Sequence, residues 1–349
     1  MALSHRRLRS PRSASSVLAS VTVGLEEFID RQGGDRRQVL SRAGLRSGLY
    51  REPNRHIPLK NYCQSMHEAA RSTGNEHFGL WFGEQFAPEG LGLFGYRATT
   101  SPDLRSAIAG MLDCFEVFQR NSLLGFSIEK GVGQLEYRLL DGDIVDRRQD
   151  AELTLGMLNN VLKWALGPHW SPLEVHFQHP ALVNNRPHRD AFQCDVRFQQ
   201  ARNVILIPES CLGKPMPDAN EMLNNVVRGT LSELAGEQPR MLSTAQRVRS
   251  ELLELLPEGE TGIDQVAGRL NLSRRSLQRQ LSAESYSFKE LVDELREDLA
   301  TYYLEYQRLS ISEVAFRLGY SEISAFTRAF IRWKDMNPSD WRNREPCVV

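Results

Sequence analysis

A short segment occurs twice near the C-terminal end of this sequence. Residues 263–273 (IDQVAGRLNLS) align with residues 311–321 (ISEVAFRLGYS), 48 positions further along. After one inserted residue, residues 277–281 (LQRQL) align with residues 326–330 (FTRAF). Because both copies carry the same pattern of apolar, small and turn-forming residues, they are predicted to fold alike.

Each copy contains the parts of a helix-turn-helix motif. Ala267 and Ala315 supply the small side chain where two helices cross closely. Asn271 and Gly319 stand at the turn, where the backbone is left-handed, a conformation that Gly adopts freely and Asn tolerates. The serine two positions beyond each turn, Ser273 or Ser321, is predicted to cap the second helix.

The flanking sequence supplies further helix starts. The pattern Ser-x-x-Glu begins at Ser287 and at Ser310, and the similar Thr-x-x-Asp begins at Thr261. A long helix between the copies has an apolar face of Phe288, Leu291, Val292, Leu295, Leu299 and Tyr302. The C-terminal third is therefore predicted to be an all-α domain of two helix-turn-helix subdomains joined by a linker helix.

The second helix of the first copy carries an unusual charge pattern. Leu277 and Leu281 are four residues apart and are predicted to face inward. The opposite face presents Arg275, Gln278 and Arg279, with Arg274 beside them. Residues 265–283 contain four arginines and no acidic residue, although residues 240–349 as a whole contain 16 basic and 17 acidic residues. Helices that are merely solvent-exposed usually mix both signs.

This face suits DNA. Arg can bind guanine through O6 and N7, and Gln can bind adenine through N6 and N7. We therefore interpret Arg274, Arg275, Gln278 and Arg279 as DNA-binding residues. The second copy offers Ser324, Thr327 and Arg328 at the equivalent positions. Only Arg328 is a strong base reader, so this helix is expected to make mainly backbone contacts.

The preceding two thirds of the chain mix both kinds of secondary structure. Residues 56–121 are mostly helical in pattern, and residues 122–129 and 134–140 alternate as a hairpin would. Helices are predicted near 149–166, 218–234 and 240–256, and strands near 173–178, 194–198 and 203–207. We predict an α+β domain with a mainly antiparallel sheet at 17–235, a linker at 236–240, and the all-α domain at 241–345.

Composition limits the class of protein. Apolar residues make up 41% and charged residues 25%, which indicates a globular chain. No apolar run is long enough to span a membrane. The five cysteines form no C-x-x-C pair, which disfavours disulfides and favours a cytoplasmic location. Residues 1–16 are basic without the apolar stretch of a secretory signal. We predict that these residues form a disordered tail, although a transit peptide has a similar composition.

No catalytic or cofactor motif emerges. The sequence has no H-E-x-x-H, G-x-S-x-G or Walker pattern. His176 and His179 are three residues apart on a predicted strand and so point to opposite faces, with His188 further along. We therefore expect no catalytic residue, no metal site and no cofactor.

The repeats closely resemble the AraC/XylS family of bacterial transcription regulators. The resemblance rests on residues 287–291 (SFKEL), 313–321 (EVAFRLGYS), 324–330 (SAFTRAF), 332–333 (RW) and 338–342 (PSDWR). It implies that two recognition helices enter successive major grooves, with Arg275, Gln278, Arg279, Ser324, Thr327 and Arg328 facing bases. The sequence departs from the family at Ser285 and Asp335, where Gly is usual.

Residues 56–218 are similar to the arabinose-binding-type sensor domain of the same family, in the subgroup of ornithine-utilisation regulators. This likeness rests on residues 92–96 (GLFGY), 101–104 (SPDL), 176–180 (HFQHP), Phe198 with Asn203, and 215–218 (PMPD). It implies a small-molecule effector and self-association. The expected partners are promoter DNA, an effector of unknown identity, RNA polymerase and a second copy of the chain.

We expect the effector to lie in a mostly apolar pocket with few polar groups, and Tyr96, Arg97 and His176 are candidate contacts. The predicted function is sequence-specific regulation, as an activator, of transcription. The alternative is a DNA-binding module fused to an enzyme that processes a small molecule, and the absence of a catalytic constellation argues against it. A purely architectural DNA-binding protein is disfavoured by the net charge of −1.

Overall fold

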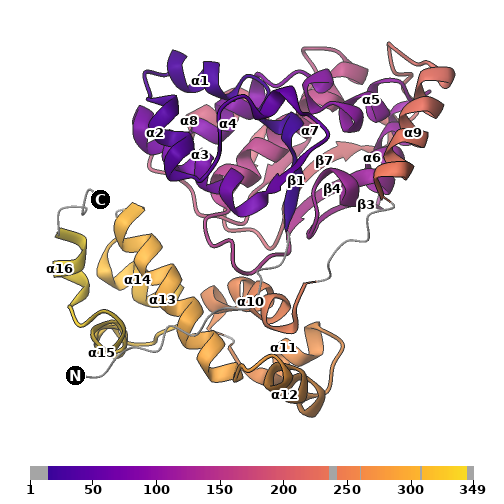
Figure 1. Ribbon diagram of the computed structural model, residues 1–349. Coiled ribbons are helices and arrows are strands. Elements are labelled where there is room, and N and C mark those ends of the chain that lie inside the picture. The colour runs from indigo at the N-terminus through magenta and orange to yellow at the C-terminus, as the bar shows by residue number, and fades with distance from the viewer. Residues whose placement is uncertain (1–14, 236–241, 260, 307–308, 344–349) are drawn as a thin grey trace.

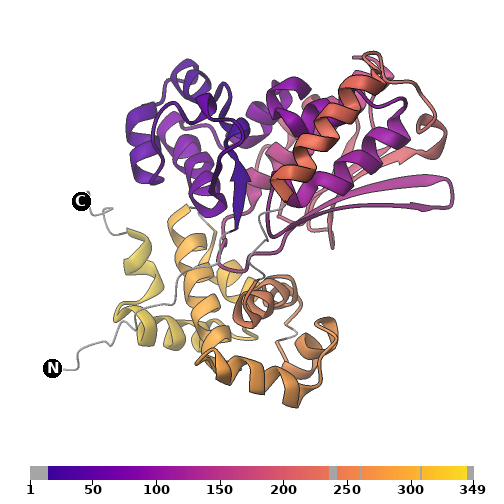
Figure 2. The same ribbon diagram turned by 45° about the vertical axis from the view of Figure 1, so that its right-hand side comes forward.

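The chain has two hydrophobic cores. The computed structural model describes residues 15–235, 242–259, 261–306 and 309–343. One core draws its side chains from Val17 to Leu231, and the other from Ala245 to Phe330 (Figures 1 and 2). The predicted linker at 236–240 and residues 1–14 of the predicted tail lie outside the described residues. No helix in the described ranges is long and apolar enough to cross a membrane.

A five-stranded sheet forms one layer of the N-terminal domain, in the order β3-β4-β7-β5-β6. Its strands are β3 (Ser122–Glu129), β4 (Val132–Leu139), β5 (Glu174–His176), β6 (Asp195–Arg197) and β7 (Asn203–Pro208). Lys130 and Gly131, both left-handed, make the tight turn of the β3–β4 hairpin. Among these strands only β5 and β6 pair in parallel, so the prediction of a mainly antiparallel sheet is confirmed.

Helices cover this sheet and continue beyond it. They are α1 (Leu25–Arg31), α2 (Arg36–Arg42), α3 (Leu59–Thr73), α4 (Phe78–Glu84), α5 (Leu93–Thr99), α6 (Leu104–Phe118), α7 (Arg148–Leu166), α8 (Arg186–Phe192) and α9 (Glu221–Ala235). Asp103 caps α6 by accepting a hydrogen bond from the Ser106 amide, as the Ser-Pro-Asp sequence there predicts.

Helix α7 lies unusually close to α4. A Cβ atom at Gly79 would come within 2.3 Å of the Gln149 carbonyl oxygen, and one at Gly83 within 2.5 Å of the Leu153 carbonyl oxygen. Asn160 closes the other end of the contact by donating to the carbonyls of Gly83, Glu84 and Phe86, each at 2.9 Å. These contacts fix α7 against its neighbour along most of its length.

The start of the domain differs from the prediction. Ser15 and Ser16, assigned to a disordered tail, are buried. Strand β1 (Ser16–Leu18) pairs with β2 (His56–Pro58) in a separate antiparallel ladder. Backbone pairing and burial hold this segment, and the basic composition of the preceding residues concealed it.

The C-terminal domain is helical, as predicted. Its helices are α10 (Thr244–Leu255), α11 (Ile263–Arg269), α12 (Arg274–Ala283), α13 (Phe288–Tyr306), α14 (Ile311–Arg317), α15 (Ile323–Lys334) and α16 (Pro338–Asn343). The turns contain left-handed Asn271 (φ 54°) and Gly319 (φ 73°), which confirms both helix-turn-helix assignments. Helix α13 connects the two units (Figure 2).

Helix starts are confirmed in part. Ser273 caps α12, and Ser310 forms a full capping box with Glu313 at α14. The prediction that Ser321 caps α15 is wrong, because the inserted residue moves the N-cap to Glu322. The predicted cap at Thr261 is also wrong, since Gly262 occupies the N-cap and its amide donates to the Gln265 side chain.

The two departures from the family pattern both lie at left-handed positions. Ser285 has φ 62° and Asp335 has φ 53°. A side chain at such a position crowds the following carbonyl, which explains why Gly is usual there. Asp335 also places a negative charge at the C-terminus of α15, where the helix dipole is unfavourable to it.

We predict that Asp335→Gly raises the free energy of unfolding by about 0.5–1 kcal/mol, by relieving the left-handed Cβ and removing the charge from the helix end. Asp335→Ala removes the charge but keeps the Cβ, so it should gain less. Calorimetry of the full chain measures both. A Gly variant that is no more stable than the Ala variant would contradict the backbone argument.

Candidate DNA-binding face and effector cavity

Helix α12 presents the residues predicted to contact bases on one exposed face. Leu277 and Leu281 are buried, at 0% and 1% exposure, and anchor the helix to the core. Arg275, Gln278 and Arg279 are exposed on the opposite side. The helical spacing therefore places the three predicted side chains together, away from the core.

The arginines in and near α12 fall into two groups, those that form ion pairs and those that do not. Arg269 contacts Glu254 at 2.8 Å and Glu251 at 3.4 Å, so its charge is neutralised on α10. Arg274 is exposed and pairs with Asp264 at 3.3 Å. Neither Arg275 nor Arg279 forms an ion pair with another described residue. The free positive charge on α12 thus lies on the face predicted to read DNA.

Helix α15 offers a weaker face. Phe326 and Phe330 are fully buried, and Ser324 and Arg328 are exposed. The Ser324 hydroxyl donates to Glu322 at 3.0 Å, and the half-buried Thr327 donates to the Ile323 carbonyl at 2.9 Å. Both hydroxyl groups therefore already form hydrogen bonds at α15. Of the three residues predicted to contact DNA from this helix, only Arg328 has a long side chain that can donate to DNA.

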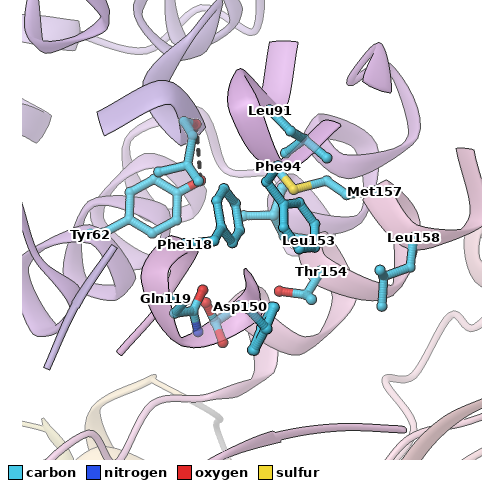
Figure 3. A pocket seen from close by; sticks show the side chains of 12 residues that line it. Tyr62, Leu91, Phe94, Phe118, Gln119, Asp150, Leu153, Thr154, Met157 and Leu158 are labelled. Carbon is cyan, nitrogen blue, oxygen red and sulfur yellow. Dashed lines mark hydrogen bonds between the residues drawn. The ribbon is translucent and has the colours of Figure 1, made fainter. Parts of the chain in front are cut away.

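A small cavity of about 20 Å³ lies inside the N-terminal domain, among α3, α5, α6 and α7 (Figure 3). Its walls are mainly apolar: Val21, Tyr62, Leu91, Phe94, Phe115, Phe118, Leu153, Met157 and Leu158. Its polar groups are Gln119, Asp150 and Thr154, together with the Tyr62 hydroxyl, which donates to the Val21 carbonyl at 3.2 Å. Thr154 is the only lining residue that is not buried, so the cavity is nearly closed.

Asp150 is the acidic group on this wall. The Tyr137 hydroxyl donates to its carboxylate at 2.6 Å, and the Gln119 side chain donates to that hydroxyl at 2.6 Å. Burial raises the pKa of Asp150 to about 6, and the hydrogen bonds from Tyr137 and Cys63 offset this only in part. The cavity therefore holds a carboxyl group that is ionised at neutral pH and protonated in mild acid.

The three candidate effector contacts lie elsewhere. Tyr96 is 40% exposed and outside the cavity lining. Arg97 donates to the Asn224 side chain at 2.8 Å and so connects α5 to α9. His176 pairs with Glu174 at 2.8 Å at the end of β5. No sequence pattern indicated the cavity residues, because their apolar side chains are indistinguishable from ordinary core.

The histidines are arranged differently from the expectation of no metal site. His176 ends β5 and pairs with Glu174, whereas His179 lies beyond the strand predicted to carry both. His179 Nε2 lies 3.5 Å from Glu152 Oε1, and His188 Nε2 lies 2.9 Å from the same oxygen. These three groups have the chemistry of metal ligands and lie together. The sequence analysis named both histidines but missed Glu152, because it lies on α7, a separate segment of the chain.

Their protonation states follow from burial and neighbouring charges. Burial lowers the pKa of His179 to about 4. Burial by itself raises the pKa of Glu152, but Arg148, His188 and His179 outweigh it and lower that pKa to about 2. The cluster thus contains an ionised carboxylate beside a neutral imidazole at neutral pH.

The segment between β4 and α7 joins the two domains. Arg249 of α10 contacts Asp143 at 3.2 Å and Asp298 of α13 at 2.6 Å. A Cβ atom at Gly142 would lie 2.3 Å from the Arg249 Cβ, so only Gly permits this approach. The Tyr302 hydroxyl of α13 donates to Asp146 at 2.8 Å. Residues 141–146, which include Gly142, Asp143 and Asp146, are therefore called the docking loop.

Comparison with known proteins identifies both domains. Residues 33–216 match the arabinose-binding N-terminal domain of AraC transcription regulators, and residues 266–344 match a helix-turn-helix domain. The chain belongs to the AraC family of transcription regulators. The family assigned from the repeats is thereby confirmed. This AraC-family chain is a DNA-binding regulator with an effector-binding domain, and it is not an enzyme.

Some relatives match nearly the whole length of the chain. The ornithine utilization regulator of Pseudomonas aeruginosa is 25% identical over 334 residues, covering 95% of this chain and 97% of that protein. The transcriptional regulator VirS of Mycobacterium tuberculosis is 23% identical over 333 residues, covering 94% and 96%. The crystal structure of CdpR from Pseudomonas aeruginosa covers 76% of this chain and 86% of that chain, at 23% identity and a TM-score of 0.38.

The raised pKa of Asp150 predicts a pH-dependent stability difference. The folded state binds the proton more tightly than the unfolded state, so this group's contribution is fully present below about pH 4 and is lost as pH rises through about 6. Between pH 4 and pH 7, Asp150→Asn should gain up to about 3 kcal/mol in free energy of unfolding relative to wild type. Urea denaturation of both full chains measures this, and parallel pH profiles would contradict it.

Proposed function

We propose that this chain is a transcription activator that reads promoter bases mainly through α12. The observation that carries the proposal is the exposed face of Arg275, Gln278 and Arg279, in which both arginines lack an ion-pair partner among the described residues. Charged and amide side chains held on one face of a recognition helix can contact neighbouring bases in the major groove. Arg274, beside this face, is proposed to contact the phosphate backbone.

The second helix-turn-helix unit is proposed to contribute affinity more than sequence preference. Ser324 and Thr327 already bond within α15, and Asp335 lies at the end of that helix. Arg328 is proposed as its principal DNA contact. Phosphate contacts of this kind position a protein on DNA without selecting a sequence.

We propose the cavity among α3, α5, α6 and α7 as the effector site, with Asp150, Gln119 and Thr154 as its polar contacts. A mostly apolar wall with a few polar groups is typical of small-molecule sites. The ionised Asp150 favours an effector that carries a cationic or hydrogen-bond-donating group. Because the cavity is small and its lining is almost wholly buried, effector binding requires the helices around Thr154 to move apart and enlarge it.

The docking loop is proposed to transmit effector binding to the DNA-binding domain. Helix α7 provides Asp150, Leu153 and Thr154 to the cavity, and its first residue directly follows Asp146 and Arg147 of the connecting segment. That segment contacts α10 and α13, which support the two recognition helices. A shift of α7 on effector binding therefore reaches the DNA-binding domain through contacts already present.

The chain is further proposed to act as a homodimer in the cytoplasm and to contact RNA polymerase. Helix α9 packs on α5 and α6 (Figure 1). Its Val227 and Leu231 are buried, whereas Met222 is 80% exposed and Val226 is 60% exposed. Pairing of this apolar face with its copy would bring two DNA-binding domains together and raise their effective concentration at adjacent sites.

Base reading by α12 predicts a specificity change. Arg279→Ala or Gln278→Ala should cost about 1–3 kcal/mol on the best DNA site and relax the preference at one base pair. Thr327→Ala should cost less, since its hydroxyl is already bonded. Gln280→Ala is the matched control, because Gln280 lies on the same helix but accepts a hydrogen bond from Thr244. Anisotropy titrations on an operator selected from random DNA measure these, and an unchanged ratio of selected to scrambled binding for Arg279→Ala would refute base reading.

If the docking loop couples the two domains, DNA binding should alter the backbone dynamics of α7, because coupling between two sites is reciprocal. Operator DNA should change amide hydrogen exchange in residues 141–155 of the full chain. Gly142→Ala should abolish this change, because its Cβ forces α10 away. Gly213→Ala is the control, since a Cβ there meets nothing within 4 Å. If the wild-type chain shows the same exchange in residues 141–155 with and without DNA, the docking loop does not couple the domains.

A further inference from the structure

Three buried metal-ligand side chains converge from separate parts of the N-terminal domain. Glu152 lies on α7, His188 on α8, and His179 follows β5. The side chains of Glu152 and His188 are fully buried, and that of His179 is 10% exposed. His188 Nε2 donates a hydrogen bond to Glu152 Oε1 at 2.9 Å, a contact that a bound metal ion would replace, and His179 Nε2 lies 3.5 Å from the same oxygen.

The hydrogen bonds around His179 leave a lone pair aimed at this carboxylate. Its Nδ1 lies 3.0 Å from the Pro180 carbonyl oxygen, and a carbonyl can only accept, so Nδ1 carries the proton. In the neutral ring Nε2 is then an acceptor that faces another acceptor. His179 Nε2 and Glu152 Oε2 are both buried without a hydrogen-bond partner. Buried polar atoms are rarely left in this state, and a cation between them would satisfy both.

The spacing suits a tetrahedral ion. Zn²⁺ binds imidazole nitrogen and carboxylate oxygen at about 2.0–2.1 Å, which places its ligands roughly 3.3 Å apart. The two Nε2-to-Oε1 distances lie on either side of that value. Glu152 Oε2 is available as a further ligand atom. The hydrogen bond from His179 Nδ1 to a backbone carbonyl is the outer contact that orients metal-bound histidines.

One neighbour opposes the ion. Arg148 approaches Glu152 Oε1 at 3.4 Å and also donates to the Glu76 carbonyl at 2.7 Å. Its charge keeps the carboxylate ionised but repels a second cation. Arg148 is also held by its shorter hydrogen bond to the Glu76 carbonyl, so a bound ion has to compete with it for Glu152 Oε1 only.

We propose that Glu152, His179 and His188 bind one divalent transition-metal ion, for which Zn²⁺ is the best fit to nitrogen and oxygen ligands in tetrahedral geometry. The ion would tie residues 179–188 to α7. Leu153, the neighbour of Glu152, lines the cavity, so metal occupancy would also stiffen the helix that forms the proposed effector site. The metal site does not depend on that proposal.

The test uses the full chain without a histidine tag, dialysed against Zn²⁺ and then against metal-free buffer, with bound metal counted by mass spectrometry. The wild-type chain should retain one ion. His179→Gln and His188→Gln should weaken Zn²⁺ binding by at least about 100-fold in a competitive chelator titration. His176→Gln is the matched control, because His176 pairs with Glu174 on the same strand and should leave binding unchanged.

A second measurement needs no variant. Co²⁺ added to the wild-type chain should give the intense visible absorption of a tetrahedral site, and Zn²⁺ should remove it. Failure of the wild-type chain to retain Zn²⁺, an octahedral Co²⁺ spectrum, or equal loss of binding in His176→Gln and His179→Gln would each overturn the proposal. Glu152 and the histidines would then form a metal-free hydrogen-bonded cluster.

Discussion

The packing of α7 on α4 positions almost everything of functional interest in the N-terminal domain. Gly79 and Gly83 let the backbones approach until a Cβ would lie 2.3–2.5 Å from carbonyl oxygens of α7. A helix held this closely moves together with α4, because rotating or sliding against α4 would break backbone contacts. Its successive faces therefore present Asp150 to the cavity and Glu152 to the histidines with little freedom in either direction.

The same close packing matters at the interface between the two domains. The docking loop leads directly into α7, and its glycine contacts α10 as closely as α4 contacts α7. Two close contacts that require glycine thus lie on either side of the docking loop and α7. One joins α7 to α4 beside the cavity, and the other joins the docking loop to α10 of the DNA-binding domain. Because rigid elements move as units, a ligand that repositions α7 acts on the docking loop as well.

The sequence predicted the C-terminal domain better than the N-terminal one, for physical reasons. Helix-turn-helix units depend on local features, such as left-handed Asn271 and the Ser310 capping box, which can be recognised within a few residues. The cavity and the Glu152–His179–His188 cluster depend on contacts among distant segments, and no spacing within one segment reveals them. The docking loop could not be predicted for the same reason, since Gly142 is required because Arg249 and the backbone of α10 lie against it.

The inserted residue in the second repeat explains why two related units differ in chemistry. In α12 the cap is the neutral Ser273, whose side chain accepts a hydrogen bond from the Ser276 amide. In α15 the insertion makes Glu322 the N-cap without a side-chain bond to the backbone, and its carboxylate instead accepts from Ser324. That acid lies at the N-terminus of α15, the end of a helix at which the dipole would otherwise favour a phosphate. One inserted residue thus replaces a neutral cap with a negative charge, and this favours the first unit over the second as the reader of sequence.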